Sequence, residues 1–333
     1  MAYNNNETAV SPIVATLVLI VVAVIGAVAV GTIMGSFSSD VSKKASAGQA
    51  AQASSTDILI AGSNPMHTAV SLVAADYMAQ NPGITIDVQR GGSSAGLSSV
   101  VNGVADIGLS TWKLNSAQTS AYPNVRQYIV GYDAVVPIVN IAVPVTSNVT
   151  YSDLERAYSN DFTGPTLPAG ITQSFINDQR DGLSDTFASL IGVGNIYSTQ
   201  NASTIIAINN YGGPNGAAIM YIANNTNTIG FTDIESALNN QNVVRILDYA
   251  GTPKTHETDT TWPTYTWQSV RDAKNGVSNP LHFPDGAIVS LELLTNGQPS
   301  SLDQSIISFM QSPNKAAQFH DDNLVHVSDI VTM

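Results

Sequence analysis

Residues 57–65 read Asp-Ile-Leu-Ile-Ala-Gly-Ser-Asn-Pro, a short apolar run followed by turn-forming residues. The run predicts a strand over Asp57–Ala61. Asn64 is a good N-cap and Pro65 suits a first helical position, so a helix is expected from here to about Gln80. The sequence Asn81-Pro82-Gly83 then ends that helix.

The same order of strand, loop and helix recurs along the chain. Ile84–Val88 predicts a second strand, residues 91–96 (GGSSAG) open a helix to about Asn102, and Ala105–Leu109 predicts a third strand. Later, Ser174–Asn177 predicts a strand and residues 180–187 (RDGLSDTF) enter another helix. This alternation predicts an α/β chain with a parallel, doubly wound sheet.

Three of these loops place hydroxyl and backbone N–H groups at a helix N-terminus, where the helix dipole favours an anion. For one loop alone, plain helix capping is the simpler interpretation. Three such loops in one chain, the last beginning with Arg180, suit a small oxyanion held by hydrogen bonds and one guanidinium group.

Composition excludes several classes of protein. The 333 residues include no cysteine, which rules out disulfide scaffolds, thiolate metal sites, a cysteine nucleophile and a lipid-modified N-terminal cysteine. The net charge of −13 argues against nucleic-acid binding. Only 11% of the residues are charged, against about 25% in ordinary globular domains. The surface is therefore expected to be polar mainly through neutral groups.

An apolar segment near the N-terminus predicts a membrane anchor. Ile13 to Met34 form 22 residues without a charge, a helix of about 33 Å against a hydrocarbon layer of about 30 Å. A cleaved signal peptide would have a basic start and a shorter apolar core. Lys43 and Lys44 follow the helix, but long domains cross membranes largely regardless of such charges. Sequons at Asn148, Asn201 and Asn224 also favour an extracytoplasmic soluble part.

Residues 7–15 (ETAVSPIVA) and the Val/Ile/Ala/Gly-rich run that follows resemble the N-terminus of archaeal type IV pilin-like proteins. The resemblance covers about the first 38 residues and implies an archaeal origin, processing before the helix and assembly through the helix into a filament. No basic residue precedes the helix, which departs from the usual processing site. Residues 36–55 are small and polar, as expected of a linker.

From Asp57 onward the chain resembles the phosphate-binding proteins of ABC phosphate importers. The runs that carry the resemblance are GSNPMH (62–67), QRGGSSAG (89–96), ADIGLSTWKL (105–114), RDGLSDTF (180–187), IGF (229–231), FPDGAIVSLELLTNG (283–297) and FMQSPNKAAQF (309–319). The family implies a two-lobed periplasmic-binding-protein-like fold of the second type, whose lobes close on a ligand. Ala134–Val143 would leave the first lobe, residues 282–294 would return to it, and a helix over residues 302–319 would pack on it.

The resemblance also implies a set of ligand-binding residues. They are Asn64 with Pro65 in the first loop, Ser93 in the second, Thr111 after the third strand, and Arg180, Ser184, Asp185 and Thr186 in the fourth. Ser93, Arg180, Ser184 and Thr186 match the family's residue types.

The remaining positions depart from the family. Asn64 stands where a hydroxyl is usual, Pro65 lacks a backbone donor, and some members have an aspartate where this chain has Thr111. Asp185 replaces a glycine. Its carboxylate would oppose a dianion if it pointed into the cleft, whereas in an outward early helical turn it would be harmless.

Two rival signals remain. Residues 92–96 fit G-x-S-x-G between a strand and a helix, the context of a hydrolase nucleophile at Ser94. Four histidines follow in the chain, none in a supporting context: His256, His282, His320 and His326. The glycines serve the anion loop equally well, so we expect no enzyme, metal or cofactor. Trp112, Trp262 and Trp267 could form a sugar platform, but loop packing near the hinge is the favoured interpretation.

These observations predict an anchored extracytoplasmic solute-binding protein that captures phosphate or a similar oxyanion for an ABC permease. The alternative is an archaeal pilin-like filament or surface subunit whose binding domain has weakened or lost ligand binding. The expected organisation is a short N-terminal segment (1–12), a transmembrane or pilin-like helix (13–35), a linker (36–56), lobe I (57–137 with 283–333) and lobe II (138–282).

Overall fold

The structure is a computed structural model that describes residues 56–145, 148–177, 182–194, 196, 204–207, 214–249, 265–277 and 283–331. Contacts divide the chain into two units, Met1–Ser54 and Ser55–Met333, and every described residue belongs to the second. The predicted anchor and pilin-like segment, residues 36–55 of the predicted linker, and Arg180 therefore lie outside the described residues. Within them, no helix is long and apolar enough to span a bilayer.

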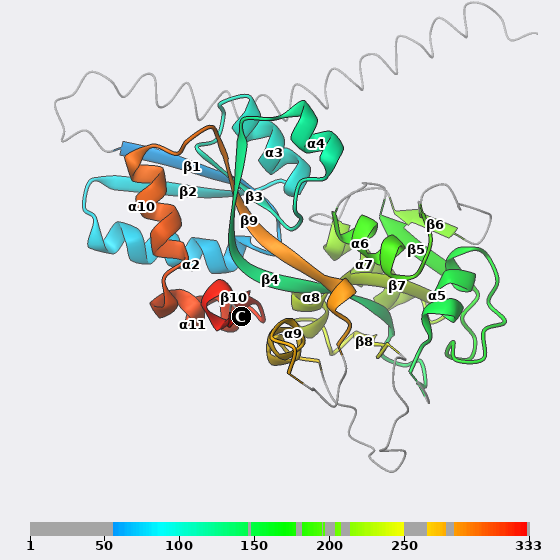
Figure 1. Cartoon of the computed structure of the whole chain (residues 1–333). Coiled ribbons are helices and arrows are strands. Elements are labelled where there is room, and N and C mark those ends of the chain that lie inside the picture. Colours follow the sequence, from blue (N-terminus) through cyan, green and yellow to red (C-terminus); the bar gives the residue numbers. More distant parts are fainter. Residues whose placement is uncertain are drawn as a thin grey trace, which may run out of the picture. The chain divides into compact units, whose positions relative to one another are not determined.

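Strands and helices alternate through most of the described chain (Figure 1). The strands are β1 (Thr56–Gly62), β2 (Ile84–Arg90), β3 (Ile107–Ser110), β4 (Val125–Asn140), β5 (Gln173–Asn177), β6 (Thr204–Ala207), β7 (Thr228–Asp233), β8 (Val244–Ile246), β9 (Ile288–Asn296) and β10 (Val325–His326). The helices are α2 (His67–Gln80), α3 (Ser93–Val101), α4 (Ser116–Ala121), α5 (Tyr151–Tyr158), α6 (Gly182–Leu190), α7 (Pro214–Asn224), α8 (Ile234–Leu238), α9 (Trp267–Lys274), α10 (Ser301–Met310) and α11 (Ala316–His320).

In the first half of the sheet, β1, β2 and β3 pair in parallel as predicted, whereas β9 and β4 make the sheet mixed. β1 pairs in parallel with β2 on one side and with β3 on the other. β9 then pairs antiparallel with β3 and with β4, which gives the order β2-β1-β3-β9-β4. The three parallel strands thus end at one edge, where ligand sites of α/β sheets form.

The second half of the sheet repeats this arrangement. β5 pairs in parallel with β6 and β7, and β4 pairs antiparallel with β7 and β8. The resulting order, β6-β5-β7-β4-β8, matches that of the first half strand for strand. Two equivalent α/β halves joined by the shared strand β4 constitute a two-lobed fold.

β4 is the strand that joins the two halves. Its residues Val125 to Ala134 pair with β9, and Val135 to Val139 pair with β7 (Figure 1). The strand is therefore longer at its start, and ends earlier, than the predicted Ala134–Val143. At its end, the side chain of Asn140 accepts a hydrogen bond from the Ala142 N–H at 2.8 Å, which turns the chain out of the sheet.

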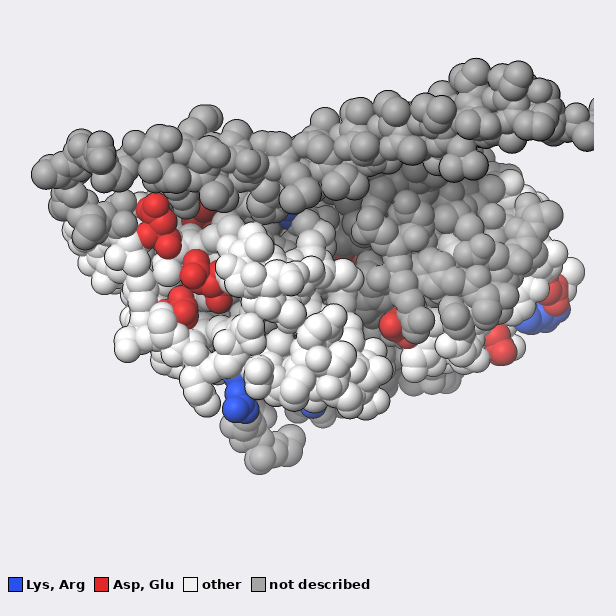
Figure 2. Space-filling view, turned by 90° about the horizontal axis from the view of Figure 1, so that it is seen from above, with Lys and Arg blue, Asp and Glu red and all other residues white. Residues whose placement is uncertain are grey.

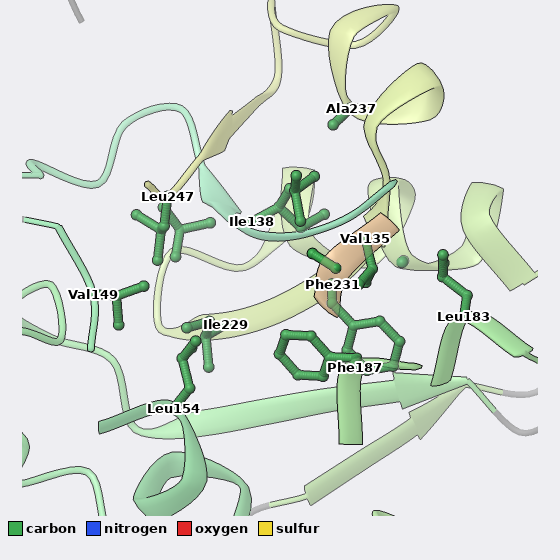
Figure 3. Packing of buried hydrophobic residues seen from close by; sticks show 14 of the residues in the cluster. Val135, Ile138, Val149, Leu154, Leu183, Phe187, Ile229, Phe231, Ala237 and Leu247 are labelled. Atoms are coloured by element: carbon green, nitrogen blue, oxygen red, sulfur yellow. The ribbon is translucent and has the colours of Figure 1, made fainter. Parts of the chain in front are cut away.

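Aromatic packing attaches α6 to the second half of the sheet. Phe187 on α6 stacks on Phe231 of β7, with ring centroids 4.3 Å apart, and Leu183 and Val135 lie around them (Figure 3). All four side chains are buried. This contact fixes the first turns of α6, which carry three of the predicted ligand residues.

The C-terminal helix packs on the first half as predicted, but it is not continuous. The ring of Tyr77 on α2 packs edge to face on that of Phe309 on α10, with ring centroids 5.1 Å apart. The predicted helix over residues 302–319 breaks after Met310, and a 3₁₀ turn over Pro313–Lys315 precedes α11. Proline has no N–H to continue the helical hydrogen bonds, which accounts for the break.

The surface carries few charges. Figure 2 shows one face with small, separated groups of acidic and basic side chains among neutral residues. This agrees with the 11% charged fraction of the sequence. Attraction of an anion must therefore come from local groups rather than from the field of the whole protein.

Candidate functional site

The candidate site begins where β1, β2 and β3 end. Their last residues are Gly62, Arg90 and Ser110. Because the strands are parallel, the loops that follow meet at the same edge of the sheet. The backbone connects them directly, since the N–H groups of Gly91 and Gly92 both donate to the carbonyl of Gly62 at 2.9 Å.

Two glycines allow the unusually close approach of these loops. Gly62 has a φ of +144°, and a Cβ atom there would lie 2.2 Å from the carbonyl oxygen of Leu109. A Cβ on Gly96 of α3 would lie 2.3 Å from the same oxygen. Only glycine fits at either position. The N-terminus of α3 is consequently held against the ends of β1 and β3.

This packing brings Ser93 and Thr111 together. The two hydroxyl oxygens are 3.0 Å apart, and the Thr111 N–H donates to Ser93 Oγ, also at 3.0 Å. Both residues are buried, with exposed fractions of 5% and 7%. Ser93 is the first residue of α3, where helical N–H groups have no partner inside the helix. Hydroxyls and free N–H groups at a helix start are suitable donors for an oxyanion.

The first loop contains a candidate that sequence reasoning missed. Ser63 is 1% exposed, and its hydroxyl has no hydrogen-bond partner among the described residues. Buried hydroxyls usually have partners, so this one is available to a ligand. The sequence did contain a signal for Ser63. The phosphate-binding proteins that this chain resembles usually have a hydroxyl at the position of Asn64, and Ser63 provides a hydroxyl one residue earlier.

Asn64 does not cap α2 as expected. The residue before the helix is Met66, and the Asn64 backbone carbonyl accepts the His67 N–H at 3.1 Å. The side-chain oxygen of Asn64 is buried and has no partner among the described residues. Pro65 lies in the turn before α2 and not at the predicted first helical position, because α2 begins only at His67.

Ser184, Asp185 and Thr186 lie in the early turns of α6. Ser184 is fully buried, Thr186 is half-buried and Asp185 is exposed. Asp185 lies in the first turn, as its dipole-favoured interpretation requires, and it also lines a pocket together with Thr186. The position of Asp185 is therefore compatible with both predicted roles, which are a favourable interaction with the helix dipole and repulsion of an anion in the cleft.

That pocket joins both halves of the fold. It is an open cleft of about 810 Å³, lined by residues of α3, of the loop after β3, of the start of α4, of α6, of the segment that leads into β9 and of the start of β9. Ser94 and Trp112 line it, and they directly follow Ser93 and Thr111 in the chain. The structure thus brings neighbours of two predicted ligand residues to the same cavity as Asp185 and Thr186.

A buried carboxylate lies behind one wall of the pocket. Glu292 of β9 is 2% exposed and accepts hydrogen bonds from Ser290 Oγ at 2.7 Å and Gln127 Nε2 at 2.8 Å. Burial raises the pKa of Glu292, and the positive charge of Lys113 opposes that rise. Ser290 and Lys113 both line the pocket.

Residues 47–289 match a family model described as a PBP superfamily domain, which is most of the chain. The chain belongs to the PBP superfamily. Among curated relatives of this PBP domain is the phosphate-binding protein PstS 2 of Streptococcus agalactiae, which is 29% identical over 117 residues. That match covers 35% of this chain and 37% of the relative's own length.

Solved structures agree with the PBP fold. A Clostridium perfringens protein described as a phosphate ABC transporter substrate-binding protein, solved with phosphate, has a TM-score of 0.62 and 17% identity. The match covers 82% of this chain and all of that one. An ABC-type phosphate transport receptor from Vibrio cholerae has a TM-score of 0.55 and 20% identity, covering 80% and 99%. These likenesses establish the two-lobed α/β architecture.

The relatives are described as phosphate-binding or phosphate-transport proteins, which agrees with the prediction that this chain is not an enzyme. Ser94 is exposed near the start of α3, and no described histidine hydrogen bonds to it. The ring of Trp267 stacks on that of His320 with centroids 3.7 Å apart, and Trp267 does not line the pocket. Trp262 lies outside the described residues.

Proposed function

We propose that this PBP protein captures phosphate, or a similar tetrahedral oxyanion, and delivers it to an ABC permease. The observation that carries the proposal is the buried hydroxyl pair of Ser93 and Thr111, together with the buried, unpartnered hydroxyl of Ser63 on the loop after β1. All three residues follow the ends of β1, β2 and β3, at one edge of the sheet. An oxyanion seated there would receive hydrogen bonds from hydroxyls and from the first N–H groups of α3.

The opposing half would complete the shell. Ser184, Asp185 and Thr186 begin α6, and Arg180, just before the helix, would supply the positive charge. One guanidinium among neutral donors suits a small anion in a protein whose net charge is −13. Asn64 would contribute its side-chain amide to the same shell.

The relatives support the ligand and the transport role. PstS 2 is named a phosphate-binding protein, and the Clostridium perfringens protein was solved with phosphate bound. We further propose an extracytoplasmic location, with Ile13–Met34 as a single-pass anchor and residues 57–137 with 283–333 as lobe I. The pilin-like N-terminal resemblance would then mark the anchor type, and self-assembly through this helix is the alternative use.

Calorimetric titration of the full chain in detergent tests the proposal. Phosphate, sulfate, molybdate and tungstate would be titrated into the unmodified chain and into Arg180→Ala. We expect phosphate to bind, and its affinity to fall by about tenfold or more in the variant because a charge-assisted hydrogen bond is lost. Absence of binding by all four anions would contradict the proposal and favour the filament or surface subunit.

A further inference from the structure

We propose that the ligand of this cleft is a phosphate monoester with a hydroxylated body, such as a polyol or sugar phosphate. This inference rests on the proposed function and specifies its substrate class. The phosphate group would occupy the oxyanion site at Ser93 and Thr111. The organic body would occupy the neighbouring cavity, here called the Trp112 pocket, whose lining includes Ser94, Trp112, Asn115, Gln118, Asp185 and Ser290.

The first argument is size. The Trp112 pocket is an open cleft with a volume of about 810 Å³. Pockets of about 300 to 1,000 Å³ are the usual size for organic ligands and cofactors. A five-atom oxyanion needs on the order of 100 Å³, the space of a few water molecules at about 30 Å³ each. Inorganic phosphate would leave most of this cavity to solvent.

The second argument is the pairing of one aromatic ring with neutral hydrogen-bonding groups. Trp112 is half-buried and lines the pocket beside Asn115 and Gln118. The side-chain carbonyls of these two residues accept each other's backbone N–H groups at 2.9 and 3.0 Å. Their NH₂ groups therefore remain as donors for ligand hydroxyls. An indole ring covers the C–H face of a sugar or polyol, while amides bind its hydroxyl groups.

The third argument concerns the wall formed by β9. Ser290 lines the pocket, and its hydroxyl donates its one hydrogen to the buried Glu292 at 2.7 Å. Ser290 can then only accept a hydrogen bond from a ligand. Sulfate, molybdate and tungstate offer no donor, inorganic phosphate offers only its remaining P–OH hydrogens, and an organic body offers several hydroxyl groups. The wall therefore favours a hydroxylated group at this position.

Asp185 supports the same conclusion. Its carboxylate lines the pocket, where it would repel the charge of any phosphate group, free or esterified. Beside a hydroxylated body, it would accept hydrogen bonds from ligand hydroxyls, which compensates for its proximity to the phosphate. The departure of residue 185 from the family's glycine thereby acquires a function.

The test compares inorganic phosphate, glycerol 3-phosphate, glucose 6-phosphate and unphosphorylated glucose by calorimetry on the full chain in detergent. We expect at least one ester to bind about tenfold or more tightly than inorganic phosphate, a difference of about 1.4 kcal/mol. Trp112→Ala should weaken that ester by about tenfold and leave inorganic phosphate within about twofold. Trp112→Phe should keep most of the ester affinity, which distinguishes a lost contact from a misfolded loop.

Tyr122→Ala serves as the matched control, because this aromatic side chain is 39% exposed and does not line the pocket. It should leave both affinities unchanged. Inorganic phosphate binding as tightly as every ester, or equal losses for phosphate and ester in Trp112→Ala, would overturn the inference and leave the proposed function standing. Failure of phosphate and both esters to bind would overturn both.

Discussion

Ser93 Oγ lies 3.0 Å from Thr111 Oγ1 and accepts the Thr111 backbone N–H at the same distance. The two residues are 18 positions apart, on the second and third loops of one sheet edge. A single serine hydroxyl therefore joins the start of α3 to the end of β3. This contact would orient Thr111 before a ligand arrives, which lowers the cost of ordering the site on binding.

Ser93→Ala should weaken oxyanion binding by about tenfold or more and lower the free energy of unfolding by about 1 to 3 kcal/mol. The reason is that the buried N–H and hydroxyl of Thr111 lose their common partner. Calorimetric titration and chemical denaturation measure the two effects. Ser98→Ala is the control, because Ser98 is exposed on the same helix. Equal anion affinity in the two variants would contradict the assignment of Ser93 as a ligand residue.

Gly96→Ala should destabilise the protein by about 3 kcal/mol and lower its melting temperature by roughly 5 to 10 °C. A Cβ atom at this position would lie 2.3 Å from the Leu109 carbonyl and 3.0 Å from that of Ala61. Both contacts are with backbone, which cannot rotate away. Gly194→Ala is the matched control, because nothing lies within 4 Å of a Cβ there. Similar melting temperatures for both variants would show that the close packing of α3 is not required.

The strand and helix order of the first half was predictable because its signals are local. Apolar runs next to turn-forming residues predict the mostly buried strands β1 and β3, and the alternation of Ile84, Ile86 and Val88 with polar residues predicts the half-exposed strand β2. β4 was predicted only in part. Its second half is buried, whereas its first half, which includes Arg126 and Gln127, is mostly half-exposed beside β9. Arg126, Gln127, Gly131 and Asp133 interrupt the apolar residues there, so no long apolar run marked this part of the strand.

The candidate site was predicted less completely, for a different reason. Ser63 and Asn64 are neighbours of similar capping ability, and nothing in their local sequence distinguishes them. Their environment depends on Leu109, whose carbonyl accepts the Ser63 N–H at 3.0 Å from a strand far along the chain. Burial created by such tertiary contacts decides which hydroxyl is available to a ligand. The break before α11 was an avoidable error, since Pro313 is a helix-ending residue by itself.

Asp185→Asn should strengthen the binding of inorganic phosphate by about twofold to tenfold. The substitution removes a negative charge from the pocket lining and keeps a side chain of nearly the same size. Raising the ionic strength should reduce the difference between the variant and the unmodified chain, because salt screens an exposed charge. Asp321→Asn, an exposed position outside the pocket lining, is the control with the same change in net charge. If both variants gain equally, the effect belongs to net charge and the pocket position of Asp185 is immaterial.

A buried acidic cluster on β4, β7 and α8 should make stability fall as pH rises. Burial raises the pKa of Glu235 to about 8 and that of Asp233 to about 6, and the charge of Asp233 adds to the rise at Glu235. Burial also raises the pKa values of Asp133 and of Asp322. The folded protein therefore holds protons that the unfolded chain releases, and the stabilisation that these protons provide is lost as pH rises through the folded pKa.

Glu235→Gln removes the ionisable carboxyl of Glu235 and so isolates its contribution to the pH dependence of stability. For Glu235 the window runs from the ordinary value of 4.5 to about 8. Over this range the melting temperature of Glu235→Gln should fall less steeply with pH than that of the unmodified chain, because the amide cannot ionise. Glu155→Gln, an exposed glutamate on α5, should leave the slope unchanged. Scanning calorimetry across the window decides the matter, and parallel curves for Glu235→Gln and the unmodified chain would show that Glu235 is already ionised in the folded protein.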